Sequence, residues 1–321
     1  KNASKSQPGV VQAIQAEVKT QTAGSPVRDG EIWTNIGLRV IASAIKPLGF
    51  NLSPGVISSI LRNTLKLGRR KISKDIPLGS SEHRNEQFER LAELRRQYEQ
   101  RGWPVLSVDT KKKELIGRFA RSGRAWTDGS LHAFDHDFGS SSSDQKAIPY
   151  GVYDTVANEA LVYLATGADT GELAADAIRR WWHRLGKFRY AGAGGILLLA
   201  DCGGSNGYRV PLYRERLHQV AATLDVPIRV AHLPPYCSKY NPIDHRLFCH
   251  LTQAISGRLV ESLSWMQMLF SKVSTSSGLN VVCELARKTY ESGIKAASEF
   301  RKNEPTQRDQ NLGQFNYVLP N

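Results

Sequence analysis

The chain has 321 residues, of which 40% are hydrophobic, and it carries a formal net charge of +13. This length allows one large domain plus a small one, and the strong positive charge favours a polyanionic partner, first of all nucleic acid. No apolar run comes near the roughly 20 residues that a membrane-spanning helix needs, which argues against a membrane partner.

Residues 1–30 are polar and rich in Gln, Ser, Thr and Ala, without a sustained apolar period. Such a composition cannot bury much apolar surface. We therefore predict a flexible N-terminal arm, or the remnant of a preceding region.

Residues 31–74 are predicted to form two short helices joined by a tight turn. Apolar residues at helical spacing define the first helix, which ends at Pro47 and Gly49, and Ser53-Pro54 caps the second. This pattern resembles a helix-turn-helix followed by a basic strap that would contact DNA phosphates. The candidate nucleic-acid-binding residues here are Arg62, Lys66, Arg69, Arg70 and Lys71. The alternative is a plain helical hairpin with a solvated charged face.

Residues 82–102 are predicted to form a charged amphipathic helix. Its apolar stripe consists of Phe88, Leu91, Leu94 and Tyr98. We expect this helix to link the two parts of the chain and to pack on the second.

Residues 103–321 change to an α/β pattern. Strand-like runs at 104–109, 148–154 and 160–165 come first, and strands at 196–200 and 227–233 then alternate with helices. Three strands followed by alternation predict a mixed sheet with helices on both faces, in the ribonuclease-H-like order. In this topology the first and fourth strands lie side by side.

Three carboxylates stand at corresponding ends of these elements. Asp109 ends the first strand, Asp201 ends the fourth, and Asp244 is the third residue of a helix that Asn241 and Pro242 open. Clustered carboxylates repel one another, and divalent cations relieve the repulsion. Hard oxygen ligands favour Mg²⁺ or Mn²⁺, and two such ions would suit in-line phosphoryl displacement.

Each of these residues also has a structural interpretation. Asp109 and Asp201 could be turn residues, and Asp244 could only complement the helix dipole. The run Lys111, Lys112 and Lys113, directly after Asp109, could be an exposed turn or could contact phosphates.

Several blocks of the sequence resemble a known family. SVDTKKKELIG, IPYGVYD, AIRRWWHRLG, ADCGGSNGYR, HLPPYCSKYNPIDHRLF and FNYVLP look like the bacterial DDE transposases of the Rhodopirellula-type insertion sequences, which are relatives of the mariner-like group. The resemblance covers residues 82–320 and is weaker in the helix-turn-helix region. It implies a metal-dependent DNA transposase that cuts the ends of its mobile element and joins them to target DNA. The family's acidic triad maps onto Asp109, Asp201 and Asp244.

The resemblance also implies an oligomeric state and a DNA partner, and the cysteines indicate a cellular compartment. Synapsis of two element ends implies a homodimer on double-stranded DNA. Four cysteines without CxxC spacing favour a reducing compartment, so we expect a cytoplasmic, nucleoid-associated protein.

Two positions depart from the family pattern. Asp244 stands where the family usually has Glu, and Tyr236 stands where its Pro-Pro-Gly loop has Gly. Mariner-type relatives use Asp at the first position, which agrees with activity. Two alternatives stay open: a decayed copy that binds DNA without cutting it, and a structure-selective nuclease on the same fold.

Overall fold

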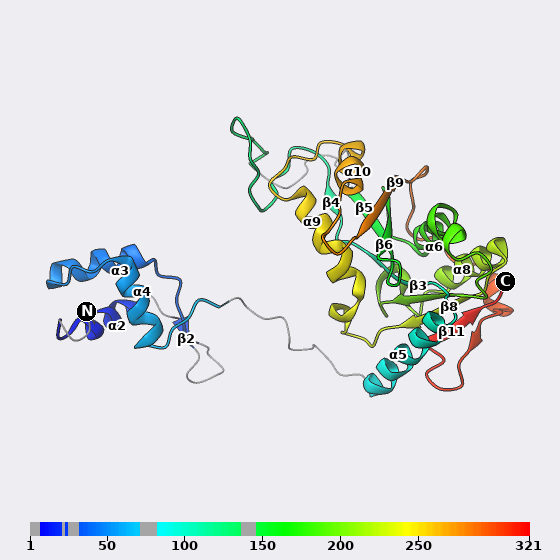
Figure 1. The fold of residues 1–321 in the computed structure, drawn as a ribbon, viewed down its shortest axis with the longest axis horizontal. Coiled ribbons are helices and arrows are strands. Elements are labelled where there is room, and N and C mark those ends of the chain that lie inside the picture. The colour runs from blue at the N-terminus through cyan, green and yellow to red at the C-terminus, as the bar shows by residue number, and fades with distance from the viewer. Residues whose placement is uncertain (1–6, 21–22, 25–31, 71–81, 136–145) are drawn as a thin grey trace. The chain divides into compact units, whose positions relative to one another are not determined.

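The computed structural model describes residues 7–20, 23–24, 32–70, 82–135 and 146–321. The chain divides into two compact units, residues 1–75 and residues 76–321, and each is described by itself (Figure 1).

Unit 1 is a small helical cluster. It consists of α2 (Val10–Thr20), β1 (Ala23–Gly24), β2 (Ile32–Trp33), α3 (Leu38–Ile45), a 3-10 turn (Lys46–Leu48) and α4 (Pro54–Asn63). Helices α3 and α4 coincide with the two predicted helices. The Ser53 hydroxyl caps α4 by accepting a hydrogen bond from the amide of Val56 at 3.4 Å.

The prediction of a flexible arm is wrong for α2. Val10, Ile14 and Val18 are buried there, and they pack with apolar residues of α3 and α4. Their i, i+4, i+8 spacing forms one apolar stripe of a helix inside a polar segment. The spacing of these residues therefore indicated a packed helix, although the polar composition of the segment did not.

Unit 2 is built on one large mixed sheet. Its strands are β3 (Val105–Thr110), β4 (Glu114–Leu115), β5 (Lys146–Asp154), β6 (Glu159–Ala165), β7 (Ile196–Ala200), β8 (Ile228–His232), β9 (Asn280–Leu285), β10 (Gln307–Arg308) and β11 (Asn316–Leu319). The order across the sheet is β10-β11-β8-β7-β3-β5-β6-β9, with β4 beside β5. The central part, β6-β5-β3-β7-β8, is the predicted ribonuclease-H-like order, with β3 and β7 parallel and adjacent. Strands β9, β10 and β11 extend it on both sides and were not predicted.

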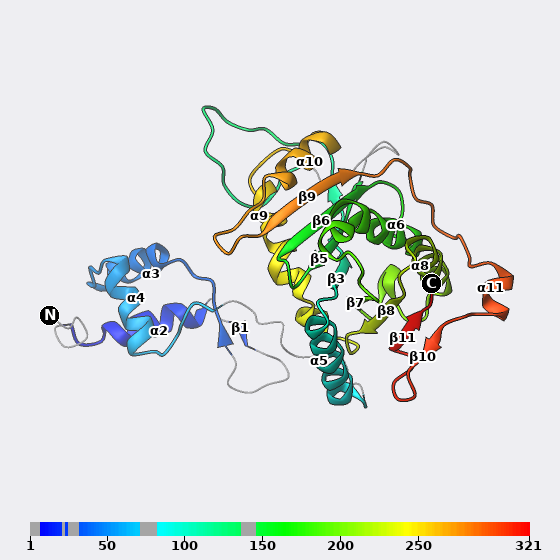
Figure 2. The same ribbon diagram turned by 45° about the vertical axis from the view of Figure 1, so that its right-hand side comes forward.

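Helices cover both faces of the sheet (Figure 2). They are α5 (Arg84–Gln100), α6 (Gly171–Trp181), a π-helical turn (Trp182–Gly186), α7 (Lys187–Arg189), α8 (Pro211–Leu224), a π-helical turn (Asp244–Phe248), α9 (Cys249–Ile255), α10 (Leu263–Ser271) and α11 (Ser298–Lys302). Alternate strand residues face opposite ways. Leu106 and Val108 therefore pack in the core that contains α6 and α8, whereas Val105 packs under α5. Helices α9 and α10 share the face of α5 and cover β5, β6 and β9.

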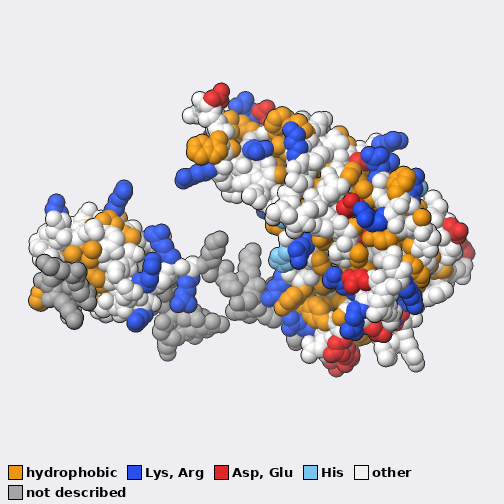
Figure 3. All heavy atoms as spheres, in the orientation of Figure 1, with side chains coloured by type: hydrophobic (Ala, Val, Ile, Leu, Met, Phe, Trp, Pro, Cys, Tyr) orange, Lys and Arg blue, Asp and Glu red, His pale blue; other side chains and the backbone are white. Residues whose placement is uncertain are grey.

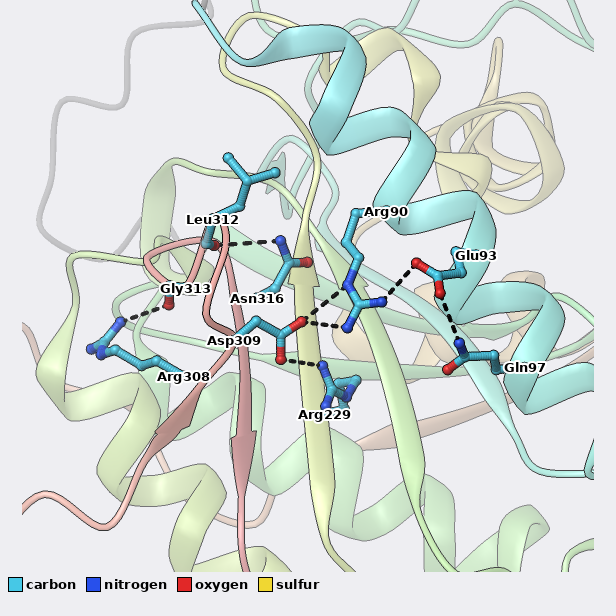
Figure 4. A network of polar contacts seen from close by, with 9 residues as sticks. All are labelled: Arg90, Glu93, Gln97, Arg229, Arg308, Asp309, Leu312, Gly313 and Asn316. Carbon is cyan, nitrogen blue, oxygen red and sulfur yellow. Dashed lines mark hydrogen bonds and ion pairs between the residues drawn. The ribbon is translucent and has the colours of Figure 1, made fainter.

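Helix α5 is fixed to the sheet by the predicted apolar stripe and by an ion-pair network. Leu91, Leu94 and Tyr98 are buried against β3, β7 and β8. At its outer side, the Arg90 guanidinium donates to the Asp309 carboxylate at 2.6 and 3.0 Å, and Arg229 of β8 donates to the same carboxylate at 2.8 Å (Figure 4). The helix is therefore part of unit 2 rather than a free connector.

Among the described residues, no helix is both long and apolar enough to cross a lipid bilayer.

Candidate active site

The strand register brings two of the predicted carboxylates together. Val108 of β3 is paired with Ala200 of β7 in the parallel ladder. Asp109 and Asp201 are the next residues after this pair, and neighbouring strands lie about 4.8 Å apart. Both follow the alternation of Val105 and Leu197, which places them on the α5 and α9 face of the sheet.

The helix that carries Asp244 lies on the same face. The backbone amide of Ile243 donates to the Ser107 hydroxyl of β3 at 3.0 Å. Gly151 of β5, paired with Asp109, makes room for this contact, because a Cβ there would come within 2.7 Å of Ile243 and Phe248. Asp244 thus begins a helix that rests directly on the edge of the sheet that carries Asp109.

Asn241 and Ser107 tie the three elements together. The Asn241 side-chain amide donates to the Asp201 carboxylate at 3.2 Å, and its oxygen accepts from the Ser107 hydroxyl. Both side chains are fully buried. The expectation that Asn241 caps its own helix is wrong, because its side chain is used in this bridge and Ser107 accepts from the helix amide instead. Sequence reasoning missed both residues, since their partners are more than 130 positions away in the chain.

The backbone of Asp201 is held from below by a buried imidazole. The His232 ring contacts the Asp201 carbonyl through Nδ1 at 2.8 Å and the Tyr317 hydroxyl through Nε2 at 3.1 Å. Burial lowers the pKa of His232 to about 4, so the ring is neutral at pH 7. Its Nδ1 is then the donor to the carbonyl, and Tyr317 of β11 donates to Nε2.

All three carboxylates have raised pKa values. Burial, and then the charge of Asp201, raises the pKa of Asp109 to about 8, with smaller contributions from Asp244 and Asp169. Burial, and then the charge of Asp244, raises the pKa of Asp201 to about 6. Burial also raises the pKa of Asp244. The three groups are therefore electrostatically coupled, and a nearby cation would favour their ionised forms.

The three carboxylates are ligands that suit a hard divalent cation, but in this structure they are too far apart to bind one ion together. Desolvated, mutually repelling carboxylates are the ligands that Mg²⁺ and Mn²⁺ favour. Within residues 7–20, 32–70, 82–135 and 146–321, however, no group of three His, Cys, Asp or Glu side chains is close enough to hold an ion as it stands. An ion would have to draw these carboxylates closer together.

The structure also shows a fourth acid at this edge. Asp169, in the loop before α6, accepts a hydrogen bond from the Thr110 hydroxyl at 2.9 Å and contributes to the raised pKa of Asp109. Thr170 caps α6, since its hydroxyl accepts from the amide of Leu173 at 3.2 Å.

The predicted basic residues have different surroundings. Lys111 is buried and pairs with Glu114, so the structure does not offer it to a phosphate, whereas Lys112 and Lys113 are exposed. Of the basic residues predicted in unit 1, Arg62, Lys66, Arg69 and Arg70 are exposed, and Lys71 is outside the described residues. Lys and Arg side chains, and no Asp or Glu, are seen on the visible face of that unit (Figure 3).

Tyr236 occupies the loop position where the family pattern has Gly. Its φ is +62°, in the left-handed region, and its side chain is 62% exposed. A non-glycine residue is strained there by roughly 1 kcal/mol. The loop therefore keeps the backbone shape that glycine would favour.

The strand order and the acidic residues at adjacent strand ends define a ribonuclease-H-like domain of the DDE class. The chain matches the family described as the Rhodopirellula transposase DDE domain over residues 13–320. It belongs to that family of DNA transposases, which confirms the resemblance seen in the sequence.

Comparison with solved structures gives distant matches to the mariner transposase Mos1. The paired-end complex with the left transposon end matches at TM-score 0.43 and 15% identity, over 82% of this chain and 71% of that one. The Mos1 strand transfer complex matches at TM-score 0.42 and 15% identity, over 80% and 68%. The Mos1 catalytic domain matches at TM-score 0.38 and 13% identity, over 62% and 86%. No protein of curated function matches the sequence.

Proposed function

We propose that this transposase cuts the phosphodiester bonds at the ends of its mobile element and joins the freed ends to target DNA, with Asp109, Asp201 and Asp244 as its catalytic residues. The observation that carries the proposal is the convergence of the three carboxylates. The β3–β7 register aligns Asp109 with Asp201, and the contact between Ser107 and Ile243 places the Asp244 helix beside them.

Asp109, Asp201 and Asp244 would hold two divalent cations, Mg²⁺ or Mn²⁺. When bound, such ions stabilise the charge that develops on the attacking and leaving oxygens of an in-line displacement at phosphorus. Water is the first nucleophile, and its attack releases a 3′-hydroxyl that attacks a target phosphodiester in the second step. Asn241 orients the Asp201 carboxylate, and Ser107 fixes the distance between β3 and the Asp244 helix.

Double-stranded DNA is the proposed partner of both units. In unit 1, the exposed residues Arg62, Lys66, Arg69 and Arg70, continued by Lys71, would contact phosphates beside α4. Lys112 and Lys113 would do so next to Asp109. A homodimer is the proposed assembly, because two element ends must be brought together.

Cleavage of a duplex that carries the flanking element ends tests the proposal. With Mg²⁺ or Mn²⁺, the parent protein should nick the duplex at the element boundary, and Asp109→Ala should not, although it still binds the DNA. A parent that never nicks under these conditions supports the alternative of a DNA-binding relative without catalysis.

A strand-transfer assay separates the transposase from a structure-selective nuclease on the same fold. Oligonucleotides with a free 3′-hydroxyl at the element end should be joined to an unrelated target duplex. Cutting without any joined product would favour the nuclease.

A further inference from the structure

Unit 2 contains a second charged region, a dense cluster of Lys and Arg side chains that includes none of the residues around Asp109, Asp201 and Asp244. Between Ala177 and Ala200 the sequence contains no Asp or Glu. The basic stripe within it consists of Arg179, Arg180, Arg184, Lys187 and Arg189, on α6, the π-helical turn and α7. Trp181 and Trp182 in the same segment are buried in the core. The indole rings therefore anchor the segment, and its charged side chains are directed outward.

The spacing of the stripe forms a row. Arg180, Arg184 and Lys187 follow one another at intervals of four and three residues, over about 10 Å of helix axis. The π-helical turn between them is tightly fixed, because a Cβ at Gly186 would come within 2.7 Å of the Trp181 ring. Such turns are frequent at functional sites. The row is therefore a rigid part of the fold.

Acidic residues neutralise only part of this charge. Arg179 pairs with Asp176, and Arg189 pairs with Glu159. Arg180 and Arg184 share one carboxylate, that of Glu284, and their side chains are 38% and 54% exposed. Within the described part of unit 2, Lys187 has no carboxylate partner, and its ammonium lies 4.9 Å from the ring centre of Phe188, itself 74% exposed. The stripe keeps a net positive charge at the surface.

A small hollow adjoins the stripe. Its volume is about 150 Å³, and its lining includes three arginines, Arg179, Arg180 and Arg287, together with His183 and one acid, Asp176, which pairs with Arg179. The three arginines outnumber the single acid. Burial, and then the neighbouring cations Lys187, Arg179 and Arg180, lower the pKa of His183. The hollow is thus of a size and charge that would accept an anionic group such as a phosphate.

We propose that the basic stripe binds the backbone phosphates of a DNA duplex at a distance from the reacting phosphodiester. The inference rests on the proposed function, because it places the duplex relative to the proposed catalytic residues. Helix α6 begins two residues after Asp169, which contacts Thr110 next to Asp109. Along the helix axis, Arg180 and Lys187 are about 14 and 24 Å from Gly171. At 3.4 Å per base pair, the contacted phosphates are roughly 4–7 base pairs from the reacting bond. A helical row of cations presents no base-reading geometry, so the binding is independent of sequence.

The test measures how the affinity of the full chain for duplex DNA depends on salt. Each phosphate contact contributes a slope of about 0.9 in the log–log plot of affinity against salt concentration. Lys187→Ala should reduce the slope by about 0.9, and the double variant Arg184→Ala, Lys187→Ala by about 1.8. The matched control is Arg301→Ala, Lys302→Ala, which removes the same charge from exposed positions on α11 and should leave the slope unchanged.

Lys187→Ala breaks no ion pair with a carboxylate, so its fold should be intact, and thermal unfolding checks this. A slope equal to that of the parent in a folded Lys187→Ala protein, or an equal loss in the α11 control, would overturn the proposal. Because this readout needs no cleavage, it is independent of the catalytic proposal: Asp109→Ala should keep the parent slope.

Phosphate-ethylation interference identifies which duplex is held. An element-end duplex and an unrelated target duplex are each compared between the parent and Lys187→Ala. Interference lost in the variant on either duplex supports the proposal and names the source. An identical pattern for parent and variant on both duplexes contradicts it.

Discussion

Unit 2 contains a carboxylate that arginines compensate, Asp309, and a cluster of three carboxylates that no cation compensates in the described residues. Asp309 lies between two guanidinium groups, those of Arg90 and Arg229, and these hydrogen bonds hold its pKa below the usual range although burial opposes them (Figure 4). Asp109, Asp201 and Asp244 form no ion pair with Lys or Arg in the described residues, and their pKa values are raised.

We propose a different role for each of the two. A carboxylate compensated by two arginines fixes α5 and β8 to the C-terminal hairpin and adds to stability. Three uncompensated carboxylates in one place reduce stability, and such arrangements are concentrated at functional sites. At the three carboxylates, a bound cation would provide the positive charge that arginine side chains provide at Asp309.

The largest expected difference is in DNA cleavage, when one carboxylate charge is removed from the cluster or from Asp309. Asp201→Asn should reduce DNA cleavage at least about 100-fold, because it removes a ligand charge where the reaction develops negative charge. Asp309→Asn should leave the cleavage rate of the folded protein within about twofold. Gel assays of nicking with equal amounts of folded protein measure both. Equal loss of activity in the two variants would break the comparison.

A smaller effect is expected for the residues that position the carboxylates. Asn241→Ala and Ser107→Ala should each lower the cleavage rate roughly 10–100-fold, as for other residues that orient metal ligands. The loss should appear in the rate at saturating DNA, with the affinity for the duplex unchanged. A change confined to affinity, or no change, would show that the bridge between Asp201 and β3 serves only packing.

The two groups should also have opposite effects on stability as pH changes. With a folded-state pKa near 8 and a usual value of 3.8, Asp109 keeps its proton in the folded protein while the unfolded chain ionises. Between about pH 4 and pH 8 the free energy of unfolding of the metal-free protein therefore falls as pH rises. Asp109→Asn removes this loss and should be more stable than the parent at pH 8 by about 1–3 kcal/mol, with the difference vanishing near pH 4.

Asp309 has the reverse sign. Its pKa is lowered on folding, so its contribution is present at neutral pH and is lost as pH falls through the folded-state pKa. Asp309→Asn should therefore be less stable than the parent at pH 7, by about 1 kcal/mol for a partly exposed ion pair. Urea unfolding from pH 4 to pH 8 measures both variants, and shifts of the same sign at pH 8 would contradict the account.

Local patterns in the sequence were enough to predict which strand ends lie side by side at the edge with the carboxylates. The short apolar runs that end at Asp109 and Asp201, and the chain order of strands and helices, determine that the two acids are neighbours. Helix α2 was missed because its three buried residues stand in a polar segment. The burial of Lys111 and the bridge from Ser107 to Asn241 depend on contacts between distant segments, which no local pattern contains. The arginine partners of Asp309 were unpredictable for the same reason, since Arg90 is 219 positions away.

Calorimetric titration of Mn²⁺ into the DNA-free protein is the most direct test of the central claim, that the three uncompensated carboxylates together bind divalent cations. The parent and Asp309→Asn should bind the ion with equal affinity. Asp109→Asn, Asp201→Asn and Asp244→Asn should each weaken binding at least about tenfold. Equal binding by all five proteins, or none by the parent, would contradict the account.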